Sequence, residues 1–124
     1  MEEAGRYERW VARYVEAWNS NDAGEIGALF TPGARYFTAP YRDPWEGHDE
    51  IVTKWIEAGD RPGDTDFRYD ILIAGPELGI VKGVTHYKSA GVTYHNLWEI
   101  RLEGDLCREF VEWWMETDQV LPRE

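Results

Sequence analysis

The sequence contains a single cysteine, Cys107, so no disulfide can form within the chain. This residue stands in a strand-like run, which favours a small buried apolar side chain over a reactive thiol. Basic residues are also few, because 13 Lys and Arg stand against 24 Asp and Glu, giving a formal net charge of -11. So acidic a surface repels phosphate backbones and anionic lipids, and we therefore expect neither nucleic acid nor a membrane as a partner.

Long apolar runs are absent as well. The amino terminus, MEEAGRYERW, is charged from its second residue and lacks the apolar core of a signal peptide, and no later segment has the length of a membrane span. We expect a soluble, cytoplasmic protein. With 43% hydrophobic residues, the 124-residue chain is long enough for one domain, residues 1–124, with a core of its own. There is no glycine-rich phosphate loop and no cysteine-histidine cluster, so the sequence predicts no cofactor and no metal.

Two stretches place apolar residues at three- and four-residue steps, which is typical of amphipathic helices. The first helix is expected over Arg6–Trp18 and another over His48–Ala58. Between them, Asp22 followed by Glu25 resembles a capping box and predicts the start of a short helix that residues 31–33 break.

Strand-like runs rich in aromatic and β-branched residues occupy most of the remaining chain. They are Ala34–Tyr41, which Pro40 ends, Phe67–Ala74, Leu78–Ser89, and a long hairpin, Gly91–Met115, that turns at residues 104–105. Helices followed by strands with short turns indicate an α+β fold with an antiparallel meander. We expect a curved, cone-shaped antiparallel sheet wrapped over about three N-terminal helices.

The pairing of the late strands decides which side chains face the helices. A tight turn at residues 89–92 would place Lys82 opposite Glu99 and Tyr87 opposite Tyr94, both favourable cross-strand pairs. It would also set two histidines, at positions 86 and 95, opposite each other on the outer face, where an exposed pair or a dimer contact is favoured over a metal site. The predicted inner face comprises Val81, Gly83, Thr85, Tyr87, Tyr94, Asn96, Trp98 and Ile100.

The hairpin at residues 104–105 permits two registers. A two-residue turn would oppose Arg101 and Arg108, whereas one extra residue, a β-bulge, would pair Arg101 with Glu109 and avoid like charges. The bulge also turns Glu112 inward, because a one-residue shift exchanges the faces of a strand. We favour the bulge.

Three segments carry a resemblance that covers essentially the whole chain. They read ARYVEAWNSNDAGEIGALFTPGARY, GHDEIVTKW and YHNLWEIRLEGDLCREFVEWWM. The arrangement resembles the nuclear transport factor 2-like superfamily and its SnoaL-like branch. This resemblance implies a SnoaL-like domain with a cystatin-like α+β barrel, in which a cone-shaped sheet surrounds a pocket. The superfamily includes isomerases, cyclases, epoxide hydrolases and binding proteins, so fold follows from it and function does not.

Two enzyme types in that superfamily test the resemblance. Ketosteroid isomerases have an oxyanion-hole tyrosine in a helix motif similar to ARYVEAWNSND, where Tyr14 stands. Their catalytic aspartate precedes a proline, but here Ala39 precedes Pro40, and their second oxyanion acid falls near Trp98. Steroid isomerisation is therefore not expected, and the aspartate-arginine-aspartate set of limonene epoxide hydrolases is also missing from the inner face.

Glu112 is the candidate acid or base, because a carboxylate among aromatic rings is desolvated and its pKa moves toward neutral pH. In the other register it would be a surface glutamate. Tyr14 is either an oxyanion donor or an ordinary core tyrosine. The candidate ligand-binding residues are Tyr14, Trp18, Tyr36, Thr38, Trp55, Tyr94, Asn96, Trp98 and Phe110.

Three functions fit these observations. The first is a protein that binds a small apolar or aromatic organic ligand and forms a homodimer through the outer sheet face around Leu97, Val111 and Trp113. The second is a cofactor-independent isomerase, cyclase or hydratase that uses Glu112 for proton transfer and Tyr14 or Asn96 to hold an oxygen. The third is an adaptor that binds a protein partner through exposed apolar surface.

Overall fold

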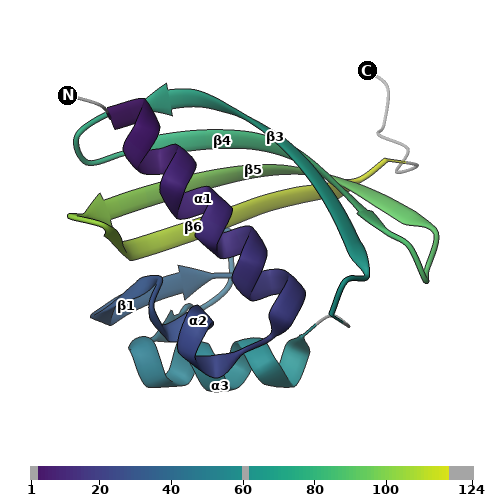
Figure 1. Ribbon diagram of the computed structural model, residues 1–124, viewed down its shortest axis with the longest axis horizontal. Coiled ribbons are helices and arrows are strands. Elements are labelled where there is room, and N and C mark those ends of the chain that lie inside the picture. The colour runs from purple at the N-terminus through teal and green to yellow at the C-terminus, as the bar shows by residue number, and fades with distance from the viewer. Residues whose placement is uncertain (1–2, 60–61, 118–124) are drawn as a thin grey trace.

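The computed structural model describes residues 3–59 and 62–117. Within these residues, three helices and six strands follow one another. They are α1 (Glu3–Ser20), α2 (Ala23–Gly27), β1 (Phe30–Phe37), β2 (Trp45–Glu46), α3 (His48–Ala58), β3 (Thr65–Ala74), β4 (Gly79–Tyr87), β5 (Val92–Glu103) and β6 (Leu106–Glu116). The strands form one sheet in the order β2-β1-β6-β5-β4-β3. The expected α+β class is confirmed, with a curved sheet that does not close on itself (Figure 1).

The long helix α1 lies across the concave side of the sheet, and α3 lies beside β1 at the other end of the molecule (Figure 1). The sequence explains the placement of α1, because its apolar stripe is the face that is buried. The buried residues of this helix are Tyr7, Trp10, Val11, Tyr14, Ala17 and Trp18. The core therefore sits between α1, α3 and the inner face of the sheet.

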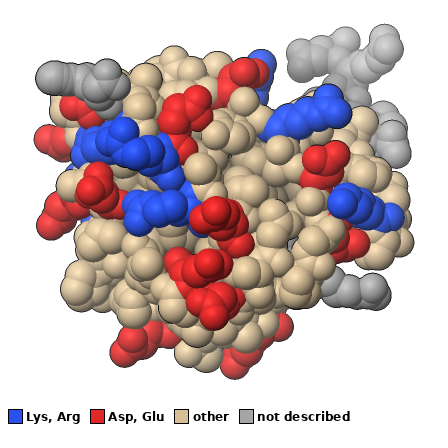
Figure 2. Space-filling view, in the orientation of Figure 1, with Lys and Arg blue, Asp and Glu red and all other residues tan. Residues whose placement is uncertain are grey.

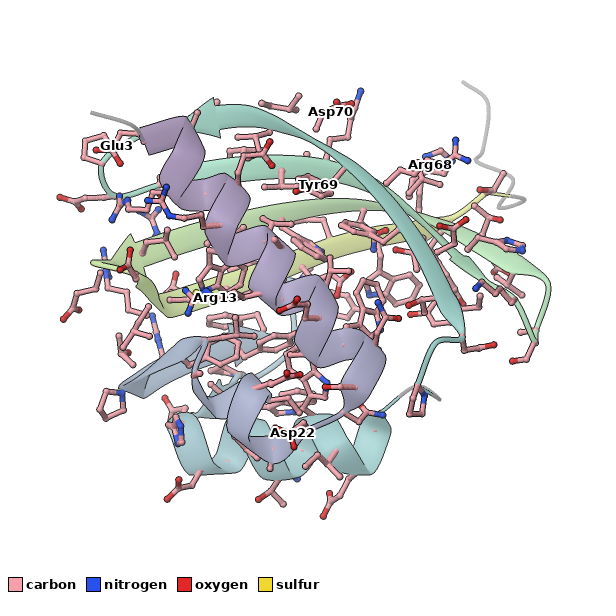
Figure 3. All side chains as sticks on the ribbon, viewed as in Figure 1. Glu3, Arg13, Asp22, Arg68, Tyr69 and Asp70 are labelled. Carbon is pink, nitrogen blue, oxygen red and sulfur yellow. The ribbon has the colours of Figure 1, made fainter. Side chains whose placement is uncertain are left out.

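The helix ends follow the predicted polar residues. The helix α1 stops at Ser20, and Asn21 adopts a left-handed conformation with φ 54°. Asp22 then caps α2, as its carboxylate accepts a hydrogen bond of 2.9 Å from the backbone N–H of Glu25 (Figure 3). The helix α3 has the bounds that its apolar spacing predicts, and Gly59 is its C-cap.

The strand β1 differs from the expectation at both ends. It begins at Phe30, so residues 31–33, expected to form a break, belong to the strand beside a register irregularity that accommodates Pro32. It ends at Phe37, before Thr38 and Pro40. Its partner β6 runs parallel to it, the one parallel pair among the described strands of an otherwise antiparallel sheet.

The predicted pairing of β4 with β5 is wrong by two residues. Tyr87 lies opposite Val92, and Lys82 lies opposite Leu97, not Glu99. The reason is the turn, which holds residues 88–91 and is closed by a 2.9 Å hydrogen bond from the N–H of Gly91 to the carbonyl of Tyr87. A two-residue shift leaves every side chain on its predicted face, because side chains alternate with a period of two. The predicted inner face is accordingly the more buried one.

The same shift separates the two histidines that were expected to face each other. His86 lies opposite Thr93, whose hydroxyl is 2.9 Å from its Nδ1, and His95 lies opposite Val84. Both imidazoles are exposed. Cys107, in contrast, is fully buried as expected, and burial raises the pKa of its thiol to about 12.

The predicted bulge in the β5–β6 hairpin is confirmed. Arg101 pairs with Glu109, the register shifts between Arg101 and Leu102, and Trp98 therefore lies opposite Glu112. Two arginines of α1 hold this hairpin against the helix. Arg6 donates to the carbonyl of Gly104 at 2.8 Å, and Arg13, labelled in Figure 3, donates to the carbonyl of Asp105 at 2.5 Å. These hydrogen bonds link α1 to the turn between β5 and β6.

Charge is distributed unevenly over the surface. In the view of Figure 2, acidic side chains spread over the centre and the lower part of the molecule, whereas the basic ones gather in separate groups near the upper left and right. Within the described residues, no helix combines the length and the apolar character that crossing a bilayer requires.

Candidate functional site

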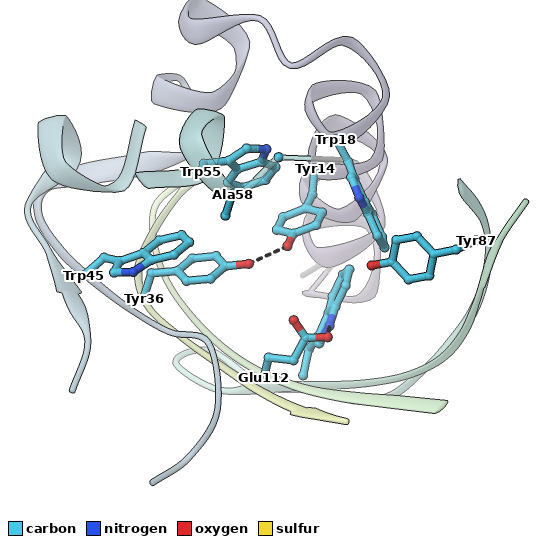
Figure 4. A pocket seen from close by; sticks show the side chains of 10 residues that line it. Tyr14, Trp18, Tyr36, Trp45, Trp55, Ala58, Tyr87 and Glu112 are labelled. Carbon is cyan, nitrogen blue, oxygen red and sulfur yellow. Dashed lines mark hydrogen bonds between the residues drawn. The ribbon is translucent and has the colours of Figure 1, made fainter. Parts of the chain in front are cut away.

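A small cavity lies on the concave side of the sheet, between α1, α3, β1 and the inner face of β4, β5 and β6 (Figure 4). Its volume is about 120 Å³. Most of its wall is aromatic, and one carboxylate stands in it. The lining residues are Tyr14, Trp18, Tyr36, Trp45, Trp55, Ala58, Gly59, Tyr87, Trp98 and Glu112.

Two tyrosine hydroxyls meet in this cavity. Tyr14 comes from α1 and Tyr36 from β1, and their hydroxyl oxygens are 2.7 Å apart (Figure 4). Both side chains are buried, and burial raises the pKa of each phenol well above its ordinary value, with the Glu112 carboxylate adding to the effect. Both phenols are therefore protonated at neutral pH. Their mutual hydrogen bond uses one of the two hydroxyl hydrogens, so the pair can donate the other to a ligand.

Glu112 projects from β6 into the cavity and is held there by hydrogen bonds from the neighbouring strand. Its Oε2 accepts from Asn96 Nδ2 at 2.6 Å and from Trp98 Nε1 at 3.3 Å. The Asn96 amide is oriented in turn, because its Oδ1 accepts from the hydroxyl of Thr85 at 2.8 Å. Thr85, Asn96 and Glu112 thus form a chain of hydrogen bonds across three strands, which fixes the position of the carboxylate.

Stacked aromatic rings pack against both tyrosines. Phe110 is fully buried and stacks on Tyr14 and Tyr36, with ring centroids 5.4 Å and 4.7 Å apart. Trp45 stacks on Tyr36 at 5.0 Å with an interplanar angle of 11°. This packing restricts the rotation of both phenol rings and keeps their hydroxyls directed into the cavity.

A second hollow of about 400 Å³ adjoins the cavity on the side of the β4–β5 turn. Tyr87 and Glu112 line both spaces, so they stand at the boundary between them. The walls of the second hollow are otherwise formed by Ala90, Val92, Tyr94, Asn96 and Trp114.

The structure brings most of the sequence-predicted site residues together. Six of them line the cavity, namely Tyr14, Trp18, Tyr36, Trp55, Trp98 and Glu112. Tyr94 and Asn96 line the second hollow. Phe110 lies beneath the tyrosine pair, as a support and not as a wall. Thr38 follows the end of β1 and lines neither space; its hydroxyl is 3.4 Å from Arg42 Nη1.

Sequence reasoning missed four residues that line the cavity. Tyr87 was on the predicted inner face but not among the candidate ligand-binding residues, although its alternation with Thr85 could have indicated it. Trp45 belongs to the two-residue strand β2, in a segment with no periodicity to interpret. Ala58 and Gly59, at the end of α3, carry no chemical signal. Their role follows only from where the helix ends beside the cavity.

The described residues contain no group of three or more His, Cys, Asp and Glu side chains placed to hold a metal ion. His48, for example, lies beside a single carboxylate in its ion pair, with its Nδ1 3.0 Å from Oδ1 of the neighbouring Asp49. The candidate site is thus the aromatic cavity with its carboxylate.

The fold is shared with several solved bacterial structures. A protein from Sphaerobacter thermophilus is 21% identical over 86% of this chain and 93% of its own, with a TM-score of 0.69. A ketosteroid isomerase-like protein from Erwinia carotovora atroseptica SCRI1043 is 17% identical over 95% and 98%, with a TM-score of 0.67. An NTF-2 like protein of unknown function from Burkholderia xenovorans LB400 is 10% identical over 98% and 91%, with a TM-score of 0.76.

At these identities the similarity to solved structures shows the fold alone. No curated protein sequence matches the chain. The sequence model of the SnoaL-like domain, in contrast, matches residues 11–115. This range includes the predicted helix motif around Tyr14, both late hairpins and Glu112. The chain therefore belongs to the SnoaL-like domain family.

Proposed function

We propose that the protein binds a small organic ligand in the aromatic cavity. The observation that carries the proposal is the meeting of Glu112 with the Tyr14–Tyr36 hydroxyl pair inside a wall of aromatic rings. Sites for small molecules place a few fixed polar groups among apolar side chains, and here Glu112 and the Tyr14–Tyr36 hydroxyls stand among aromatic rings. The fixed polar groups would orient the ligand.

The volume limits what can enter. A cavity of about 120 Å³ has space for about four water molecules, since each takes about 30 Å³ in the liquid. Pockets for drug-sized ligands start at about 300 Å³, so the cavity alone accommodates only a small head group. A larger ligand would extend past Glu112 and Tyr87 into the second hollow of about 400 Å³.

A fragment screen tests this proposal directly, because four tryptophans line the cavity and report on its occupation by fluorescence. Soluble small organic fragments, neutral and cationic, are screened by tryptophan fluorescence and thermal shift. A ligand at 100 times its Kd should raise Tm by about 10 °C for a chain of this length. If no fragment changes either signal, the proposed function is refuted.

A matched pair of variants locates the binding. Ala58→Trp places a large ring at the cavity wall, whereas Thr53→Trp adds the same ring to an exposed position of α3 outside the cavity. Binding should be lost in the first variant and retained in the second. Equal binding in both would mean that the ligand sits elsewhere.

A second function, proton transfer without a cofactor, is favoured by one specific arrangement. Glu112 can accept a proton from a bound molecule, while the Tyr14–Tyr36 pair donates to an oxygen on which negative charge develops. Glu112→Gln should then lower kcat by about 10²–10⁴-fold on any substrate found, with Tm nearly unchanged. Glu99→Gln, on the outer face, is the control and should keep full activity. Retained turnover in Glu112→Gln would remove this carboxylate from the reaction.

We also propose that two copies associate through the outer face of the sheet. Leu97 and Val111 are partly buried there, and Trp113 is 45% exposed. Trp113 donates a 2.7 Å hydrogen bond to Glu99, which holds its indole against the sheet. A partly exposed tryptophan that is held in place beside Leu97 is the kind of residue that anchors protein interfaces.

A further inference from the structure

The composition of the cavity wall points to the charge of the ligand, a step that rests on the proposed binding function. Among the described residues that line the cavity there are four tryptophans, three tyrosines and one glutamate, and there is no Lys, Arg or His. Aromatic rings attract cations through the negative potential of their faces, and the carboxylate adds a full negative charge. An anionic ligand would be repelled by the Glu112 carboxylate and would meet no positively charged side chain among the described residues of this wall.

We infer that the cavity takes a small methylated ammonium ion, such as the head group of a quaternary amine. Aromatic side chains around a carboxylate form the kind of cage that recognises such ions, because methylated nitrogen has a modest hydration energy and makes favourable contacts with ring faces. The wall holds seven aromatic side chains and a single carboxylate, and this favours methyl groups on the nitrogen over several N–H donors.

The position of Glu112 agrees with this role. Hydrogen bonds from Asn96 and Trp98 end on Oε2, an arrangement that suits an oxygen carrying negative charge and keeps the carboxylate in place before a ligand arrives. A purely apolar ligand would desolvate this carboxylate without offering an opposite charge. A cation would desolvate it too, but its attraction to the carboxylate would compensate for the lost solvation. The cage is therefore preorganised for positive charge.

The rest of the molecule favours the same ligand. The net charge of -11 raises the local concentration of cations around the protein, and groups of acidic side chains are spread over the face in Figure 2. The cavity volume of about 120 Å³ suits a compact head group. An apolar or aromatic tail would extend past Tyr87 into the second hollow, where Tyr94 and Trp114 stand with their rings 5.6 Å apart.

Two probes of nearly equal shape test the inference. Choline carries a quaternary nitrogen where 3,3-dimethylbutan-1-ol carries a neutral carbon, so their affinities differ through charge alone. Binding to the wild-type protein is measured by isothermal titration calorimetry and tryptophan fluorescence. Choline should bind at least about tenfold more tightly, which corresponds to 1.4 kcal/mol, and its affinity should fall as salt is added.

A variant then locates the charge effect. Glu112→Gln should weaken choline binding by about tenfold or more and change the affinity of the neutral alcohol by less than about threefold. Glu99→Gln, with the same change of charge on the outer face, should leave both affinities unaltered. The comparison of the two probes on the wild-type chain stands even if the Glu112 variant folds poorly.

Three results would overturn the inference. The neutral alcohol could bind as tightly as choline, choline could bind equally well to the Ala58→Trp variant, or neutral aromatic fragments could bind in the cavity while choline does not. In the first and third cases the proposed binding function still stands. If neither probe nor any fragment binds, the proposed function fails as well, so the two failures are distinguishable.

Discussion

The Tyr14–Tyr36 hydroxyl pair offers a quantitative test of how the candidate site is built. Their hydroxyl oxygens are 2.7 Å apart, and the two side chains are only 5% and 6% exposed. Replacing either tyrosine by phenylalanine leaves the other hydroxyl without its partner, which costs about 1–3 kcal/mol for a buried polar group. Replacing both removes the pair together, so the double variant should be no less stable than either single one.

The predicted coupling between the two substitutions is therefore about 1–2 kcal/mol. For a chain of this length, the entropy of unfolding is about 0.26 kcal/mol per degree, so 1 kcal/mol changes Tm by about 4 °C. Each single variant should lower Tm by about 4–12 °C, and the double variant should not lower it further.

Urea unfolding of the four proteins, followed by tryptophan fluorescence, measures this cycle. Tyr41→Phe is the matched control, since Tyr41 is 76% exposed, and it should leave stability within about 0.5 kcal/mol of the wild type. Additive losses, with a coupling below about 0.3 kcal/mol, would refute the reasoning. They would mean that water in the cavity satisfies each hydroxyl separately.

Three further predictions concern pH, packing and assembly. Burial raises the pKa of Tyr14 and Tyr36, whereas both ionise near pH 10 in the unfolded chain, so stability should be full below about pH 10 and fall above it by up to about 1.4 kcal/mol per pH unit for each tyrosine. Gly79→Ala should lower the free energy of unfolding by about 1–3 kcal/mol, because the new Cβ would overlap the ring of buried Tyr7. Trp113→Glu should convert the proposed dimer to a monomer in light scattering at micromolar concentration.

Each of these has a control in the same chain. A Tyr14→Phe/Tyr36→Phe protein should lose less stability between pH 10 and 11 than the wild type, and an identical loss would contradict the assignment. Gly33→Ala should be nearly neutral, since a Cβ there meets nothing within 4 Å, and a loss equal to that of Gly79→Ala would argue against the packing explanation. Tyr41→Glu, away from the outer sheet face, should keep the dimer; a wild-type protein that is already monomeric would refute the proposed interface.

Local sequence patterns determined the helices and the faces of the strands. The apolar spacing of α1 and α3 and the Asp22 cap depend on residues close in sequence, so propensity and periodicity are sufficient to predict them. The inner face of β4 and β5 was also predictable. A two-residue error in register does not change it, because alternation is all that decides which side chains point inward.

The inward position of Glu112 could be inferred from charge pairing. Only the bulged register places Arg101 opposite Glu109 and avoids two arginines side by side, and the structure has that register. The actual length of the β4–β5 turn was not predictable in this way. Several turn lengths satisfy the same alternation, and the hydrogen bond that closes residues 88–91 is a property of the folded hairpin.

The assembly of the site depends on contacts between segments that are distant in sequence. The hydroxyls of Tyr14 and Tyr36 come from elements whose pairing nothing in the local sequence specifies, and they meet because β1 lies parallel to β6 beneath α1. Trp45 reaches the cavity through a two-residue strand without periodicity. Which residues face inward could be predicted from local sequence, since that depends on alternation and helical spacing. Which of them meet around one carboxylate was decided by long-range packing, since contacts between distant segments depend on how the whole sheet curves.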